Sequence, residues 1–121
     1  MPELQEGRYA GEFVVSEGNG KISRETITVL SGETLQAGAV LGKVTASGKY
    51  KVLDPAAVDG SESAAGILYD AVDASAADAE GVAIVRLAEV NAAELFWPEG
   101  ITGPEQTTAL GELAALHIIA R

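Results

Sequence analysis

The segment Glu25-Thr26-Ile27-Thr28-Val29-Leu30 decides the fold class of this chain, because polar and apolar residues alternate along it. Ile27 and Val29 fall on one face and the threonines on the other, which is the two-residue period of a half-buried strand. Short apolar runs bounded by glycines and polar turns follow, as in chains whose strands reverse direction repeatedly. We therefore expect further strands at residues 40–44, 50–53, 64–69 and 82–88, the last of them central, and an acidic loop at 70–80.

A helix is expected near the C-terminus. The stretch Thr102-Gly103-Pro104-Glu105 combines an N-cap threonine, a proline in the first turn and a glutamate three positions after the cap. These signals predict a helix over residues 104–116, after a shorter capped turn at 91–94 and before a final strand at 117–120. The residues expected on its buried face are Leu110, Leu113, Ala114 and either Leu116 or His117. The chain is thus predicted to be a small single domain of the α+β class, mostly β, with one C-terminal amphipathic helix.

Composition limits the function. The 121 residues carry 18 acidic and 8 basic side chains, a net charge of −10, and such a surface repels nucleic acid. The longest apolar stretches fall far short of the roughly 20 residues that a membrane helix needs, and residues 1–6 lack the order of a signal peptide. Cysteine is absent, so stability must come from packing and association.

Residues 1–24 are interpreted as a flexible N-terminal arm and residues 25–121 as the folded domain. Charged residues and glycines surround one short apolar run in the arm, Phe13-Val14-Val15, and an Asn-Gly turn then leads to Ile22 and Arg24. A weak hairpin within the arm is one interpretation of this pattern. An extended apolar run on a mobile segment also suits binding by strand addition, in which backbone bonds give affinity and alternate side chains give register.

The sequence offers no catalytic constellation, so we expect a protein that binds and is not an enzyme. Its only histidine, His117, is placed at the apolar side of a helix end, without a nucleophile or base at motif spacing. The four acids Asp70, Asp73, Asp78 and Glu80 could suggest a calcium loop, but their spacing does not aim oxygens at one ion. Neither a metal nor a cofactor is expected.

The segment Leu95-Phe96-Trp97-Pro98 holds the only tryptophan and one of two phenylalanines. Tryptophan is enriched at interface hot spots, so this segment is a candidate contact between protein surfaces. The alternative is that Trp97 fills the protein's own core beside the helix. Sequence leaves both interpretations open.

The order of these motifs resembles that of the lambda-type head decoration proteins of tailed bacteriophages. Ala64-Ala65-Gly66-Ile67-Leu68 is similar to the A-x-G-I-L strand of that family, and Glu94-Leu95-Phe96-Trp97-Pro98-Glu99 to its L-x-W-P-E segment. An acidic alanine-rich loop and a long apolar strand separate the two, and an amphipathic helix follows. The likeness covers roughly residues 25–121, whereas the arm differs in length and composition.

The resemblance implies a β-tulip-like fold and a homotrimer that cements the expanded head. Such a protein is made in the bacterial host cytoplasm and sits on the outer surface of the virion head, at three-fold and quasi-three-fold sites. There it binds the major capsid protein, with its arm added as a strand, and stabilises the shell against internal DNA pressure. The expected capsid-binding residues are Phe13, Val14, Val15, Ile22 and Arg24. The expected trimer interface is Leu95, Phe96, Trp97 and Pro98.

A lipoyl-like or biotinyl-like carrier domain is the alternative. Residues 31–42 resemble the G-x-x-L-x-x-G-x-x-L rhythm of those barrels. A carrier must present a lysine on a tight hairpin, and Lys43 and Lys49 lack the neighbours of either type of attachment site. An acidic metal-dependent enzyme is a second and weaker rival.

Overall fold

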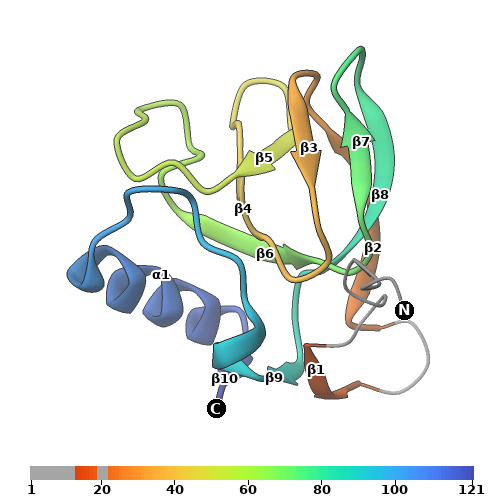
Figure 1. Cartoon of the computed structure of the whole chain (residues 1–121). Helices are drawn as coiled ribbons and strands as arrows, with labels where there is room; N and C mark the ends of the chain where they lie inside the picture. The colour runs from red at the N-terminus through yellow and green to blue at the C-terminus, as the bar shows by residue number, and fades with distance from the viewer. Residues whose placement is uncertain (1–12, 19–21) are drawn as a thin grey trace, which may run out of the picture.

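A closed five-stranded barrel forms the centre of the computed structural model, which describes residues 13–18 and 22–121 (Figure 1). Its strands follow the order β2-β5-β4-β6-β8 around the barrel. They are β2 (Arg24–Val29), β4 (Val40–Lys43), β5 (Tyr50–Val52), β6 (Ala64–Leu68) and β8 (Ala79–Ile84). Four of the five strands lie where the alternation of the sequence predicts them, and the mostly β, α+β fold class is confirmed.

The strand β8 begins and ends earlier than expected. It pairs with β2 in antiparallel register, from Arg24 opposite Ile84 to Val29 opposite Ala79. The apolar run then leaves the barrel, and Leu87 adopts a left-handed backbone conformation (φ 54°) before β9 (Ala88–Val90) begins. The expected single strand at 82–88 is therefore divided between two sheets. The sequence does not reveal this division, because the apolar run continues through it without a break.

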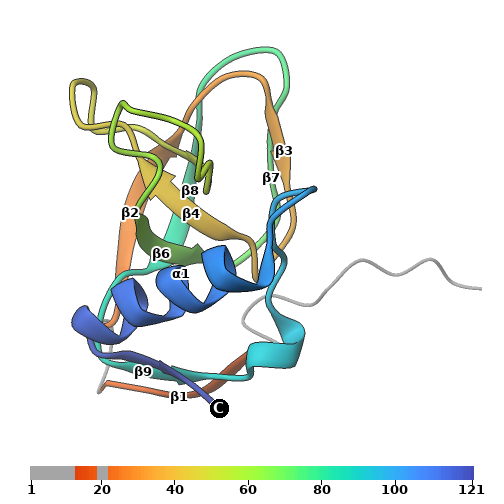
Figure 2. The same cartoon turned by 90° about the vertical axis from the view of Figure 1, so that its left-hand side faces the viewer.

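A three-stranded sheet lies outside the barrel. It has the order β1-β9-β10, where β1 is Val14–Glu17 and β10 is Ile118–Ala120. The helix α1 (Gly103–Ala115) lies between this sheet and the barrel (Figure 2). One apolar core joins the three layers and includes Phe13, Ile67, Leu113 and Ile118. A second core fills the barrel.

The helix begins as the sequence predicts, and its capping explains why. The Thr102 side chain accepts a hydrogen bond from the Glu105 amide (3.2 Å), and the Glu105 carboxylate accepts one from the Thr102 amide (3.0 Å). Its buried residues are Ala109 and Leu113, with Leu110 and Leu116 partly buried against the core. The expectation that Ala114 or His117 faces the core is wrong, because both are exposed.

Residues 13–18 and 22–24, which the sequence assigned to a flexible arm, belong to the folded body. Phe13 is 1% exposed, and β1 pairs with β9, from Val14 opposite Val90 to Glu17 opposite Ala88. The hairpin considered for the arm does not form in these residues, because β1 pairs with β9 and β2 pairs with β8 and β5. The remainder of the predicted arm, residues 1–12 and 19–21, lies outside the described residues.

Smaller elements complete the described chain. The strands β3 (Glu33–Leu35) and β7 (Val72–Ala74) form a two-stranded sheet, although β7 falls within the acidic loop predicted at residues 70–80. The expected capped turn is the 3-10 helix η1 (Ala92–Glu94), with Asn91 as its N-cap. Within residues 13–18 and 22–121, no helix is long and apolar enough to cross a membrane.

Candidate functional site

The residues expected to grip a capsid do not share one environment. Phe13 is buried and Val14 packs partly against the core, so both hold β1 to the body. Val15 and Ile22 are 57% and 51% exposed, which leaves them available to a partner. Arg24 is partly buried at the start of β2. The five residues therefore divide into three with structural contacts and two that remain candidates for contact.

Arg24 ties β1 to the barrel. Its Nη2 and Nε lie 2.7 and 3.1 Å from the two carboxylate oxygens of Glu17 in β1, and its guanidinium lies 4.0 Å from the ring centroid of Tyr69. Nη2 also donates to the Tyr69 hydroxyl (2.9 Å). The hydrogen bond to Glu17 is the main reason that the pKa of Arg24 is raised. A bidentate, stacked guanidinium restricts the orientation of β1, so Arg24 acts as a clamp at the base of the N-terminal segment.

The Leu95–Pro98 segment divides in the same way. Leu95 is buried in the protein's own core, so it cannot supply much area to a trimer contact. Phe96 packs partly against the barrel core, and its backbone bonds to Gly38 and Val40. Trp97 and Pro98 are partly exposed, with Trp97 also packed against the outer core. Both interpretations of Trp97 thus have support, since one part of the side chain is packed and another is accessible.

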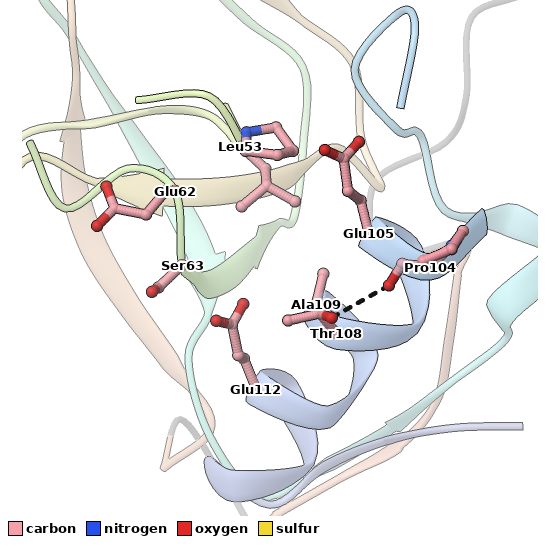
Figure 3. Close-up of a pocket in the computed structure, with 9 residues that line it drawn as sticks. Leu53, Glu62, Ser63, Pro104, Glu105, Thr108, Ala109 and Glu112 are labelled. Atoms are coloured by element: carbon pink, nitrogen blue, oxygen red, sulfur yellow. Dashed lines mark hydrogen bonds between the residues drawn. The ribbon is translucent and has the colours of Figure 1, made fainter. Parts of the chain in front are cut away.

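A groove between α1 and the loop before β6 gathers three carboxylates (Figure 3). It encloses about 350 Å³, and Glu62, Glu105 and Glu112 lie around its apolar floor of Leu53 and Ala109. Each carboxylate already accepts a backbone hydrogen bond. The donors are the amides of Gly60, Thr102 and Ala64, at 2.8, 3.0 and 2.8 Å. These glutamates therefore fasten the loop and the helix. In the described part of the chain, no three His, Cys, Asp or Glu side chains are placed so that they could hold one metal ion.

A second concavity lies at one open end of the barrel and was not singled out from the sequence. We define this barrel mouth by Glu25, Lys43, Tyr50, Arg86 and His117, which border a cavity of about 560 Å³ together with small apolar residues. Burial raises the pKa of the Tyr50 phenol, Glu25 raises it further and Arg86 lowers it. The alternation of β2 and β4 places Glu25 and Lys43 on the interior side, but sequence cannot show that the barrel closes there.

A comparison with protein families matches this chain over nearly its whole length. The family described as bacteriophage lambda head decoration protein D matches residues 3–118. A search of curated protein sequences finds no match. The family match supports the resemblance found in the motif order and favours it over the carrier-domain alternative. It extends to Glu3, so it also includes the N-terminal residues where the motifs gave no likeness.

Proposed function

Because the chain belongs to the bacteriophage lambda head decoration protein D family, we propose that it binds the outside of a phage head as a homotrimer and stabilises the shell. Capsid decoration is a structural role on the virion exterior, and it requires no catalysis. The match over residues 3–118 carries this proposal. The strand-rich fold and the acidic composition, with a net charge of −10, suit a protein that meets other proteins rather than packaged DNA.

The sheet β1-β9-β10 supports attachment through the N-terminal residues. A closed barrel leaves no free strand edges, whereas β1 is the outer strand of its sheet and pairs on one side with β9. Residues 1–12 precede Phe13 and β1 in the chain. We assign the capsid grip to residues 1–12 with the exposed side chains of Val15 and Ile22, and we assign anchoring of the N-terminal segment to Phe13 and Arg24.

Trimer formation needs an apolar contact that offsets charge repulsion. Three copies carry three times −10, or −30 charges. Phe96, Trp97 and Pro98 are the partly exposed residues of the expected interface, whereas Leu95 is buried within its own chain. A partly packed tryptophan has lost much of its side-chain freedom before association, which favours its use as an interface anchor.

Stabilisation of the shell would follow from mass action. A ligand that binds the expanded shell and not its disassembled form adds about 2.7 kcal/mol of stability at one hundred times its dissociation constant. A trimer that contacts several capsid subunits at once gains further through avidity.

The test is binding to undecorated, expanded heads of the phage that encodes the protein. We expect full-length trimers to decorate the heads in electron micrographs and to raise their resistance to heat, and a chain without residues 1–12 to remain a folded trimer that leaves heads bare. The full-length Val15→Ser variant should decorate more weakly, and Thr107→Ser, on the exposed helix face, should decorate normally. Equal decoration by the truncated and full-length chains would refute the role of the N-terminal residues.

A further inference from the structure

A ring of three identical copies imposes a requirement on this chain. Three-fold contacts are heterologous, so each copy must present two different patches that fit one another. Trp97 and Pro98 supply one patch under the proposed function, on which this inference rests. The second patch must complement it in charge and shape, and the barrel mouth meets that requirement.

Among the described residues, the barrel mouth holds the one lysine or arginine that has no carboxylate within 4 Å. Arg86 is paired with Glu25 at 2.8 Å, whereas Lys43 and His117 contact no carboxylate of the described residues. The other described lysines and arginines each have a carboxylate within 4 Å: Arg24, Lys49, Lys51, Arg86 and Arg121. Lys43 instead lies 5.7 Å from the ring centroid of Tyr50. In a chain with 18 acids and 8 bases, an exposed lysine without a carboxylate partner marks a place where an outside carboxylate would be attracted.

The segment beside Trp97 offers such a carboxylate. Glu99 is exposed and makes no hydrogen bond or ion pair with the residues that the structure describes. It follows Pro98 directly, so one short segment presents an indole, a proline and a free carboxylate together. The mouth presents the matching chemistry, because the apolar side chains of Ala115 and Leu116 line it together with Lys43 and His117.

The two patches lie at opposite ends of α1. The loop that carries Glu99 leads into the N-terminus of the helix (Figure 2). The mouth is lined by residues 115–117 at the other end of the helix. A helix of 13 residues spans about 20 Å, so one copy cannot satisfy both patches by itself. This separation allows each copy to give one patch to one neighbour and receive the other patch from the second neighbour.

We propose that the barrel mouth receives residues 97–99 of a neighbouring copy, with the Glu99 carboxylate paired to Lys43 and the indole of Trp97 against Leu116. The contact repeats three times in the ring. Each repeat joins an exposed lysine to an exposed glutamate, and neither side chain has an ion-pair partner among the described residues of its own chain.

Charge reversal of the full-length protein tests this pairing. Lys43→Glu and Glu99→Lys should each raise the concentration at which half of the chains are assembled by about tenfold or more in sedimentation equilibrium, since like charges then face one another. The double variant with both reversals should return to within about threefold of the original value. Arg121→Glu and Asp70→Lys serve as controls, because they make the same charge changes at exposed positions outside both patches and should leave assembly unchanged.

The outcomes separate this inference from the proposed function. Single reversals that assemble normally, or a double variant that assembles worse than either single variant, would overturn the pairing while the homotrimer stands. Normal assembly with lost decoration of heads would assign the mouth to a shell protein and would also overturn it. An unmodified chain that stays monomeric at all concentrations would overturn the homotrimer and the pairing together. Circular dichroism of each variant verifies that the exposed substitutions preserve the fold.

Discussion

Replacing Phe13 with alanine should destabilise the folded domain by about 3 to 5 kcal/mol, the range for deleting a buried phenylalanine side chain. Phe13 is 1% exposed, lies in the outer core and is only 3.8 Å from the position that a Cβ on Gly38 would take. Its carbonyl also accepts a hydrogen bond from the Asn91 amide (2.8 Å), and that backbone bond survives the substitution. The lost stability is therefore expected to come from packing of the Phe13 side chain, while β1 stays paired with β9.

Thermal unfolding by circular dichroism measures this effect, at one protein concentration because association shifts the midpoint. For a chain of 121 residues, a loss of this size corresponds to a midpoint lowered by roughly 10 to 20 °C. Val15→Ala is the matched control two positions away, and its 57% exposure predicts a change within about 0.5 kcal/mol. Equal midpoints for Phe13→Ala, Val15→Ala and the unmodified chain would show that residues 13–18 do not pack on the body.

Two further predictions test local features of the fold. Gly42→Ala should displace the loop that carries Ser61 from β4, because a Cβ there would lie 2.7 Å from the Cα of Ser61 and closer still to its carbonyl oxygen. A large drop in the urea midpoint would verify this, against an unchanged or slightly raised midpoint for Gly111→Ala inside the helix. Asp78→Asn should lower stability at pH 7 but have little effect once the pH lies below the folded-state pKa of this carboxyl, because the hydrogen bond from Lys49 lowers that pKa below its ordinary 3.8 and the resulting stabilisation is lost as pH falls through it. Urea unfolding at both pH values checks the sign, and an equal difference at both would contradict it.

The sequence predicted correctly those strands and helices that are determined by residues close together in the chain. The alternation around Ile27 and Val29 gave β2, and the cap at Thr102 gave α1, because each depends on neighbours within a few residues. The same reasoning failed where distant pairing decided the outcome. Residues 72–74 look like loop, yet they become a strand because Glu33–Leu35 lies opposite them. The division of the apolar run after Ile84 likewise follows from closure of the barrel.

The candidate surfaces were harder to predict for the same reason. Phe13 and Leu95 were selected as apolar residues suited to contact, but the outer core buries both, and composition cannot distinguish a core residue from an interface residue. For Trp97 the sequence left core and interface open, and its partial burial is compatible with both. The barrel mouth was missed because Lys43 and His117 are distant in sequence, and only the folded chain brings them to one cavity.

The anchoring of β1 has a consequence for attachment to a shell. Ordering one residue of backbone costs about 1 to 2 kcal/mol, and a segment that folds on binding must meet that cost from its contact energy. Residues 13–18 are already held by Phe13, by pairing with β9 and by the Arg24–Glu17 clamp, so their ordering is completed when the domain folds. Because these six residues are already ordered, binding to the shell avoids an entropic cost of roughly 6 to 12 kcal/mol. Weakening the clamp with Glu17→Gln should therefore reduce decoration of heads in electron micrographs while it lowers the thermal midpoint of the domain only slightly, because β1 loses the charged partner of Arg24 while the outer core stays packed. Unchanged decoration would contradict this role of the clamp.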